Sequence, residues 1–217
     1  MEITRSAVRP AQRRSWGRVV SGMAGLLLLL GGVAVQPAVA GGATEAMKST
    51  IDEVLNIVQD KELKQPGRAE ERRQRLEQVV GDRFDYPEMS RRALGAPWNT
   101  LSDKDKQEFV GLFKTLLTNS YSDKVETYSG DGVQYLNERT EKDFAEVRTK
   151  VLTGKTEIPL DYRLLNKGVE WRVYDVVVDG VSLVSNYRGQ FTKILRSSSY
   201  TDLVDQLRKK SDKIKAP

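Results

Sequence analysis

The sequence predicts an α+β fold in which helices precede and follow an antiparallel sheet. Apolar residues recur every three or four positions from residue 44 to residue 128, as expected for helices. They alternate with polar residues from 133 to 173 and return to helical spacing from 184 onwards. Glycine-containing turns separate the three stretches. A run of strands between two runs of helices is typical of α+β proteins.

The first 40 residues have the pattern of a secretory signal peptide. Five arginines and one acid lie in residues 1–18, an apolar run follows from Val19 to Val35, and Ala38-Val39-Ala40 is a small-x-small cleavage pattern. We expect cleavage after Ala40, export by the Sec route to the periplasm, and a single domain over residues 41–217. The alternative is a retained membrane anchor, which the short apolar run and the cleavage pattern disfavour.

Composition narrows the classes of function. Removal of five arginines and one glutamate with the signal peptide lowers the net charge from +5 to about +1, which gives no support to nucleic-acid binding. The chain has no cysteine and no histidine, and histidine is the usual general base and the commonest zinc ligand. We expect a protein that is not an enzyme and has no metal and no cofactor. Catalysis by carboxylates, lysine or tyrosine stays open at this point.

Two helical segments open the domain, and the first of them is amphipathic. The first helix is expected over residues 44–60, and Gln65-Pro66-Gly67 ends it. A second, at about 68–80, is rich in arginine and glutamate, which is most simply a solvated face with pairs four residues apart. The apolar face of the first helix consists of Met47, Ile51, Val54, Leu55 and Val58.

Two further helices are expected before the sheet. A short one covers Tyr86–Leu94 and ends at Gly95. The longest follows a capping box at Ser102, with Asp105 in the position usually held by glutamate, and continues to about Tyr128. Its wide apolar face consists of Phe109, Leu112, Phe113, Leu116, Leu117, Tyr121 and Val125.

Four strands are expected next, at about 133–135, 145–151, 157–164 and from Val169 onwards. Their alternation predicts an antiparallel sheet with one wet face. Asn166-Lys167-Gly168 predicts a hairpin turn before the fourth strand. Pro159 predicts a sheet edge or a bulge, because proline cannot donate to the ladder.

The end of the fourth strand differs from the rest. From Tyr174 to Val178 both faces are mainly apolar, so we expect cover on two sides, with Asp179-Gly180 forming the turn that closes the strand. Helical spacing resumes from Val184 to Leu195, and a final helix carries Tyr200, Leu203, Val204 and Leu207.

Few residues are candidates for catalysis. Asp175 and Asp179 lie four apart on a strand, about 13 Å at strand rise, which is too far for one metal ion or a carboxylate pair. We expect Asp175 to be exposed or paired with a nearby arginine. Ser182 and Ser185 have no histidine to activate them.

The stretch Trp171–Asp175, followed by Val181–Val184, Asn186–Arg188 and Gln190-Phe191, resembles the C-terminal signature of the MlaC family. The resemblance extends over nearly all of residues 41–217. It implies a curved, cystatin-like sheet of about four strands that encloses a hydrophobic pocket with N- and C-terminal helices. It also implies a periplasmic phospholipid carrier that preserves outer-membrane lipid asymmetry. The implied partners are phospholipid, an outer-membrane lipoprotein–porin complex and an inner-membrane ABC transporter with an MCE subunit.

A lipid carrier needs an enclosed apolar pocket. Two acyl chains have about 30 methylenes, and exposing them to water would cost about 24 kcal/mol at about 0.8 kcal/mol each. Arg163 and Arg188 are weaker candidates for contact with the headgroup, which we expect to lie largely in solvent at the mouth. The residues expected to line the pocket are Phe113, Leu116, Leu117, Tyr121, Val147, Tyr162, Leu164, Trp171, Tyr174, Val176, Val181, Leu183 and Val184.

Two alternatives come from other classes of protein. A cystatin-like α+β fold also hosts small hydrolases and isomerases, which the lack of histidine and of convergent acids disfavours. An envelope adaptor without lipid cargo would purify empty, whereas a carrier retains lipid. We expect the carrier to be a monomer that binds no nucleic acid.

Overall fold

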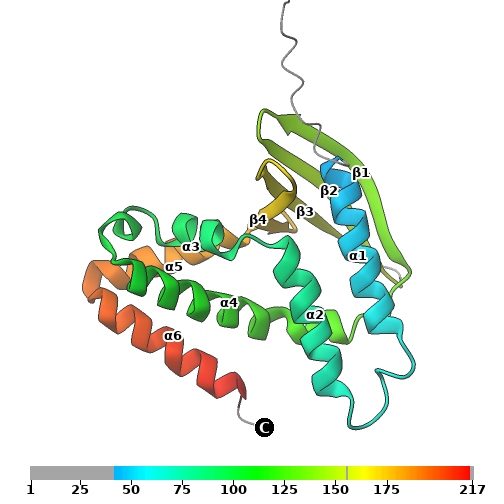
Figure 1. The fold of residues 1–217 in the computed structure, drawn as a ribbon, viewed down its shortest axis with the longest axis horizontal. Helices are drawn as coiled ribbons and strands as arrows, with labels where there is room; N and C mark the ends of the chain where they lie inside the picture. Colours follow the sequence, from blue (N-terminus) through cyan, green and yellow to red (C-terminus); the bar gives the residue numbers. More distant parts are fainter. Residues whose placement is uncertain (1–41, 155, 216–217) are drawn as a thin grey trace, which may run out of the picture. The chain divides into compact units, whose positions relative to one another are not determined.

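The computed structural model describes residues 42–154 and 156–215, and the expected signal peptide lies outside this part of the chain. Within these residues an α+β fold is observed, with helices on both sides of the strands in chain order (Figure 1). The helices are α1 (Ala43–Gln59), α2 (Ala69–Arg83), α3 (Tyr86–Leu94), the 3-10 helix η1 (Ala96–Thr100), α4 (Asp103–Glu126), α5 (Leu183–Ser197) and α6 (Tyr200–Lys215). The strands are β1 (Gly132–Glu141), β2 (Phe144–Thr153), β3 (Thr156–Asn166), β4 (Trp171–Val178) and β5 (Val181–Ser182).

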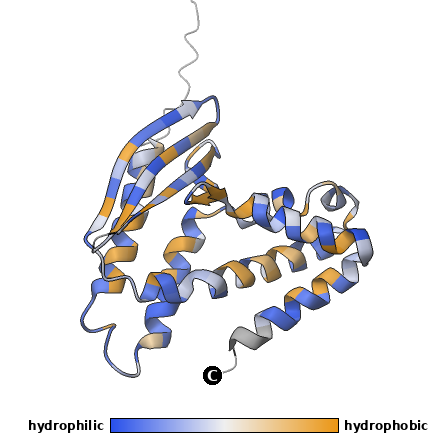
Figure 2. Ribbon diagram, turned by 180° about the vertical axis from the view of Figure 1, so that it is seen from behind, coloured by the Kyte–Doolittle hydropathy of each residue, from blue (hydrophilic) through white to orange (hydrophobic). Residues whose placement is uncertain are grey.

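The strands form one curved, antiparallel, open sheet in the order β1-β2-β3-β4-β5. The predicted meander of four strands is confirmed, and the two-residue strand β5 is added to it. Hydrophobic and hydrophilic residues alternate along the long strands in Figure 2, as expected for a sheet with one face against helices. Strand β1 lies at one edge of the sheet, and β5 at the other.

The start of the fourth strand was predicted wrongly. Val169 is 83% exposed and lies in the loop between β3 and β4, and β4 begins at Trp171. The predicted turn at Asn166-Lys167-Gly168 is nevertheless present, and the backbone N–H of Gly168 donates to Oδ1 of Asn166 at 2.8 Å. The loop is therefore longer than a tight two-residue turn, and it leaves the valine in solvent.

The turn at Asp179-Gly180 is confirmed. Both residues have positive φ, 48° and 78°, which a two-residue hairpin with the native twist requires. Leu160 is the last β3 residue to pair with β4, so Pro159 lies where the β3–β4 ladder ends. Its carbonyl still accepts from the N–H of Asp179, in the turn after β4, at 2.9 Å.

A bulge in β4 decides which face each of its side chains occupies. Arg163 lies opposite Asp175 and Leu164 lies opposite Val173, so Tyr174 is the extra residue. A regular strand would place residue 175 on the same face as Val173. The bulge instead places Val176 there, opposite Tyr162, and turns Asp175 to the other face. A second bulge lies in β1 at Leu136, between the pairs made by Tyr135 and Asn137.

Two separate hydrophobic cores hold the elements together. In the first, α1 covers the sheet face that carries Val147, Tyr162 and Leu164, called the inner face from here on. The second core lies among α3, α4, α5 and α6, around Phe109 and Phe113. Phe84, which follows α2, packs against both cores.

Polar caps fix the helix ends. The capping box at the start of α4 is confirmed: Oγ of Ser102 accepts from the N–H of Asp105 at 3.2 Å and donates to its carboxylate at 2.6 Å. At the start of α1, the carboxylate of Glu138 in β1 accepts from the N–H of Thr44 at 2.8 Å and from its hydroxyl at 2.6 Å. An acid at a helix N-terminus is favourable, and this one also fastens α1 to the edge strand.

Replacement of Phe109 by alanine tests the core of the helices. Its side chain is fully buried and contacts the rings of Trp98, Phe113, Phe191 and Tyr200. We expect Phe109→Ala to lower the free energy of unfolding by about 3–5 kcal/mol, measured by urea denaturation. A loss below about 1 kcal/mol would show that this core is not packed as described.

Candidate functional site

Part of the inner face of the sheet keeps its apolar side chains partly exposed. Val133, Leu160 and Val178 pack against the core under α1 but are only partly buried. Ile158 is 37% exposed and Val181 is 56% exposed. We call Val133, Val151, Ile158, Leu160, Val178 and Val181 the open patch.

Strand register places these side chains on one face. Val133 pairs with Val151, which pairs with Ile158, and partners in an antiparallel ladder point to the same side. The next row runs from Leu160 to Val178 and on to Val181. The two rows are adjacent, because positions two apart on a strand share a face. The open patch is therefore one continuous apolar surface.

Helices border the open patch without covering it. Leu55 of α1 and Leu183 at the start of α5 pack against the same core as Val133, Leu160 and Val178, and both are partly buried. The open patch, together with Leu55 and Leu183, can bind apolar chains, because apolar side chains would lie beneath such chains and beside them.

The predicted lining residues do not all come together. Those on the inner face are buried under α1, whereas those on the long helix lie in the core of the helices, together with Val184. Tyr121 is partly buried beside that second core. The residues of the first group are Val147, Tyr162, Leu164, Trp171 and Val176. Those of the second are Phe113, Leu116, Leu117 and Val184.

Tyr174, the bulge residue, lies beside Phe144 and under Arg92. The guanidinium of Arg92 stands 4.0 Å from the centre of the Tyr174 ring, and the Phe144 ring meets it edge-on at 5.9 Å. Phe144 belongs to the outer face, since its neighbour Ala145 points inward. Burial raises the pKa of Tyr174, and the nearby Arg92 opposes that effect.

The two arginines proposed for the headgroup differ in their surroundings. Arg163 lies on the outer face, 3.2 Å from the carboxylate of Asp175 and 3.4 Å from that of Glu146. Arg188 is exposed on α5 beside Gly95, and it makes no ion pair with the described residues. The assignment of either to a headgroup stays a prediction.

Asp175 joins the sheet to α5. Its carboxylate is 5% exposed and accepts from Arg163, from the hydroxyl of Ser182 at 2.6 Å and from the N–H of Val184 at 3.1 Å. Ser182 in turn caps α5 by accepting from the N–H of Ser185 at 3.0 Å. The expected pairing with an arginine is confirmed. The contact with the start of the helix was missed, and no local pattern indicates it.

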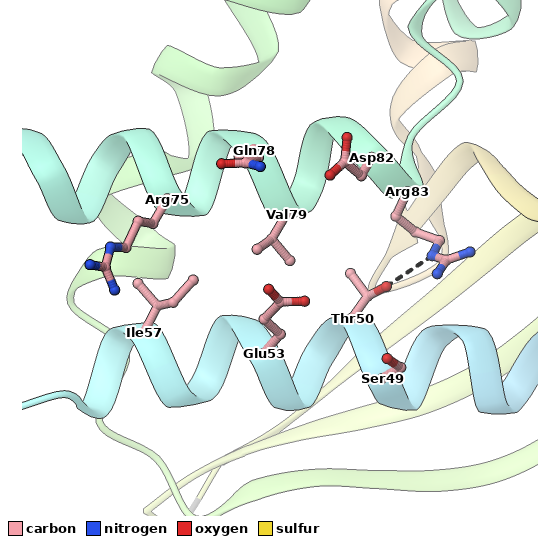
Figure 3. Close-up of a pocket in the computed structure, with 9 residues that line it drawn as sticks. All are labelled: Ser49, Thr50, Glu53, Ile57, Arg75, Gln78, Val79, Asp82 and Arg83. Atoms are coloured by element: carbon pink, nitrogen blue, oxygen red, sulfur yellow. Dashed lines mark hydrogen bonds between the residues drawn. The ribbon is translucent and has the colours of Figure 1, made fainter.

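A polar cavity between α1 and α2 was also missed (Figure 3). Its volume is about 260 Å³, below the roughly 300–1,000 Å³ of typical small-molecule pockets. Arg83 spans one end, donating to Thr50 at 2.9 Å and to the carbonyl of Trp171 at 2.8 Å. Its lining residues are Ser49, Thr50, Glu53, Ile57, Arg75, Gln78, Val79, Asp82 and Arg83, most of them polar, so it is not a container for acyl chains.

Residues 42–154 and 156–215 contain no group of three or more histidine, cysteine, aspartate or glutamate side chains placed to hold a metal ion. None of the helices described there is long and apolar enough to cross a membrane. Asp179 is exposed in its turn, and Asp175 is held by three partners, so the two acids do not form a pair.

Comparison with known proteins identifies one family. A family model described as "MlaC protein" matches residues 48–209. The intermembrane phospholipid transport system binding protein MlaC of Haemophilus influenzae is 24% identical over 122 residues, which are 54% of this chain and 57% of that protein. A phospholipid-binding protein from Ralstonia solanacearum, solved in complex with a phospholipid, is 26% identical with a TM-score of 0.73. That match covers 80% of this chain and 99% of the solved chain.

Replacement of Asp175 by alanine tests its role as a joint. The variant loses acceptors for a backbone N–H, a hydroxyl and a guanidinium. We expect Asp175→Ala to lower the free energy of unfolding by about 2–3 kcal/mol, mainly through the bonds to Ser182 and Val184, because the side chain of Arg163 is 39% exposed and keeps Glu146 as a partner. Thermal or urea unfolding measures the loss. Glu141→Ala, on the exposed end of β1, is a matched control that should change stability by less than about 0.5 kcal/mol.

Proposed function

We propose that this chain, which belongs to the MlaC family, is a phospholipid carrier that works between the inner and outer membranes. The observation that carries the proposal is the match to a fold solved with a phospholipid bound, which spans 99% of that chain. The open patch supports it, because a continuous apolar surface on the inner face of a sheet is costly to leave in water unless something covers it.

The acyl chains need more space than the structure leaves open. The open patch contacts acyl chains on one side only, so it removes only part of their hydrocarbon from water. Exposure of two whole chains would cost roughly 24 kcal/mol, and an enclosing wall is required to avoid most of that cost. We propose that lipid enters between the open patch and the helices, which move apart to admit it. The two cores are distinct clusters that meet at Phe84. Helices α3–α6 can therefore move relative to the sheet while Phe109 and Phe113 stay packed, once the contacts of Phe84 and the bond from Val184 to Asp175 give way.

The proposed compartment and partners are those that membership of the family suggests. We propose that the mature chain, residues 41–217, acts in the periplasm after Sec export. There it exchanges lipid between an outer-membrane lipoprotein–porin complex and an inner-membrane ABC transporter with an MCE subunit. The Haemophilus influenzae relative is named an intermembrane phospholipid transport system binding protein, and that name supports the proposed exchange between two membranes. Preservation of outer-membrane lipid asymmetry is the proposed role.

We propose a binding role rather than catalysis. The chain has no histidine. Of the two acids in the signature, Asp175 accepts a hydrogen bond from the N–H of Val184 at the start of α5, and Asp179 lies in a turn. Arg188 is proposed for contact with the headgroup at the mouth. Arg163 is a poorer candidate, since two carboxylates already accept from it.

Native mass spectrometry of the mature chain, purified without detergent from a bacterial host, tests the carrier proposal. We expect a mass increment that corresponds to phospholipid, and the lipid recovered by extraction identifies the chains. A chain that is empty, and that takes no lipid from phospholipid vesicles, would instead be an adaptor or an enzyme.

Introduction of charge into the open patch tests the location of the site. An ionised carboxylate in contact with acyl chains has to be desolvated, so we expect Val178→Glu to reduce lipid occupancy at least tenfold. Because Val178 is partly exposed, the circular dichroism spectrum should remain that of the wild type. Val169→Glu, in the exposed loop before β4, is the matched control and should keep its lipid. Equal lipid occupancy of the two variants would show that the acyl chains bind outside the open patch.

A further inference from the structure

One phenol on the inner face has no hydrogen-bond partner. The hydroxyl of Tyr135 is buried, and no donor or acceptor in the described part of the chain contacts it. A buried polar group without a partner is destabilising, and native proteins contain few of them. An unexplained donor of this kind indicates a missing ligand when it lies beside a binding surface.

Tyr135 does lie beside the open patch. Its register partner is Thr149, which pairs with Leu160, and Leu160 pairs with Val178. Tyr135 therefore continues the row of the open patch towards α1. It packs against the same core as Val133 and Leu160.

The groups around Tyr135 leave its hydroxyl available as a donor. Lys48 of α1 stands over the face of the ring, 5.6 Å from its centre, and its ammonium group is a donor only, so it offers the phenol O–H no acceptor. Burial, with a smaller contribution from the carboxylates of Asp52 and Glu45, raises the pKa of Tyr135 to about 12. The phenol thus stays protonated over the working pH range. It is also close enough to Tyr162 to help raise the pKa of that buried residue.

We infer that the hydroxyl of Tyr135 donates a hydrogen bond to an ester carbonyl oxygen of the bound lipid. The inference rests on the proposed phospholipid cargo. A diacyl lipid offers acceptors in its ester and phosphate groups, and the ester carbonyls are the acceptors attached directly to the acyl chains. A donor that is buried at the border of an apolar patch meets the carbonyl first, whereas the phosphate keeps its solvation near the mouth. Tyr135 would therefore set the depth at which the chains are seated.

A competition between two lipids tests this role. Vesicles contain equal amounts of an ester-linked phosphatidylethanolamine and its di-ether analogue with the same chain lengths, which lacks the carbonyl oxygens. Native mass spectrometry then gives the ratio of the two lipids on the loaded carrier. We expect the wild type to prefer the ester lipid about three- to tenfold, the effect of one hydrogen bond, and Tyr135→Phe to lose most of that preference.

Two measurements separate this role from a structural one. The unloaded Tyr135→Phe protein should unfold at a temperature no lower than the wild type, because the change removes a donor that has no partner. Tyr200→Phe is the matched control: its hydroxyl donates to the carbonyl of Asp105 at 3.2 Å among the helices, so the variant should keep the ester preference.

The remaining outcomes would overturn the inference in distinguishable ways. Retention of the full ester preference by Tyr135→Phe at unchanged total lipid occupancy would exclude the hydrogen bond while leaving the carrier proposal intact. Retention of the preference at a lower total occupancy by both lipids would assign the acceptor to the phosphate and contradict the ester assignment. A wild-type protein that takes up neither lipid would overturn the carrier proposal, and the role of Tyr135 with it.

Discussion

The fold depends on how the inner face of its sheet is covered. A five-stranded open sheet presents more apolar surface than one helix can bury, and α1 covers only the part that carries Val147, Tyr162 and Leu164. Helices α3, α4, α5 and α6 bury most of their apolar residues against one another, around Phe109 and Phe113. The sheet therefore keeps an uncovered apolar area. In a protein without cargo such an area would favour aggregation, whereas in a lipid carrier it is the kind of surface that acyl chains can cover.

The bulge at Tyr174 reconciles two demands on one strand. β4 has to complete an apolar inner face, and it also has to present a carboxylate to the start of α5. A regular alternation cannot do both, because Asp175 would share a face with Val173. The extra residue shifts the alternation by one position, so that Val176 points inward and Asp175 meets Arg163, Ser182 and Val184 on the other side.

Local patterns were sufficient to predict most elements. The ends of α3, the cap of α4 at Ser102 and the turn at Asp179-Gly180 each depend on a few neighbouring residues, and the sequence shows them directly. The error at Val169 arose because alternation continues through an exposed loop. The site was harder to predict, since an apolar residue such as Phe113 or Val147 has the same spacing in a closed core as in a pocket. The division into two cores and the unpaired Tyr135 depend on contacts between distant segments.

The edge strand β1 affects how readily two copies of this chain could associate by strand pairing. Its ten residues have a neighbour on one side only, and such an edge can template the addition of another strand. The bulge at Leu136 interrupts that template, and Glu138, Arg139 and Glu141 add charges of both signs along it. A second copy would have to align these charges and match the irregular ladder. The edge thus disfavours fibre-like association, also in the proposed open state that would admit lipid.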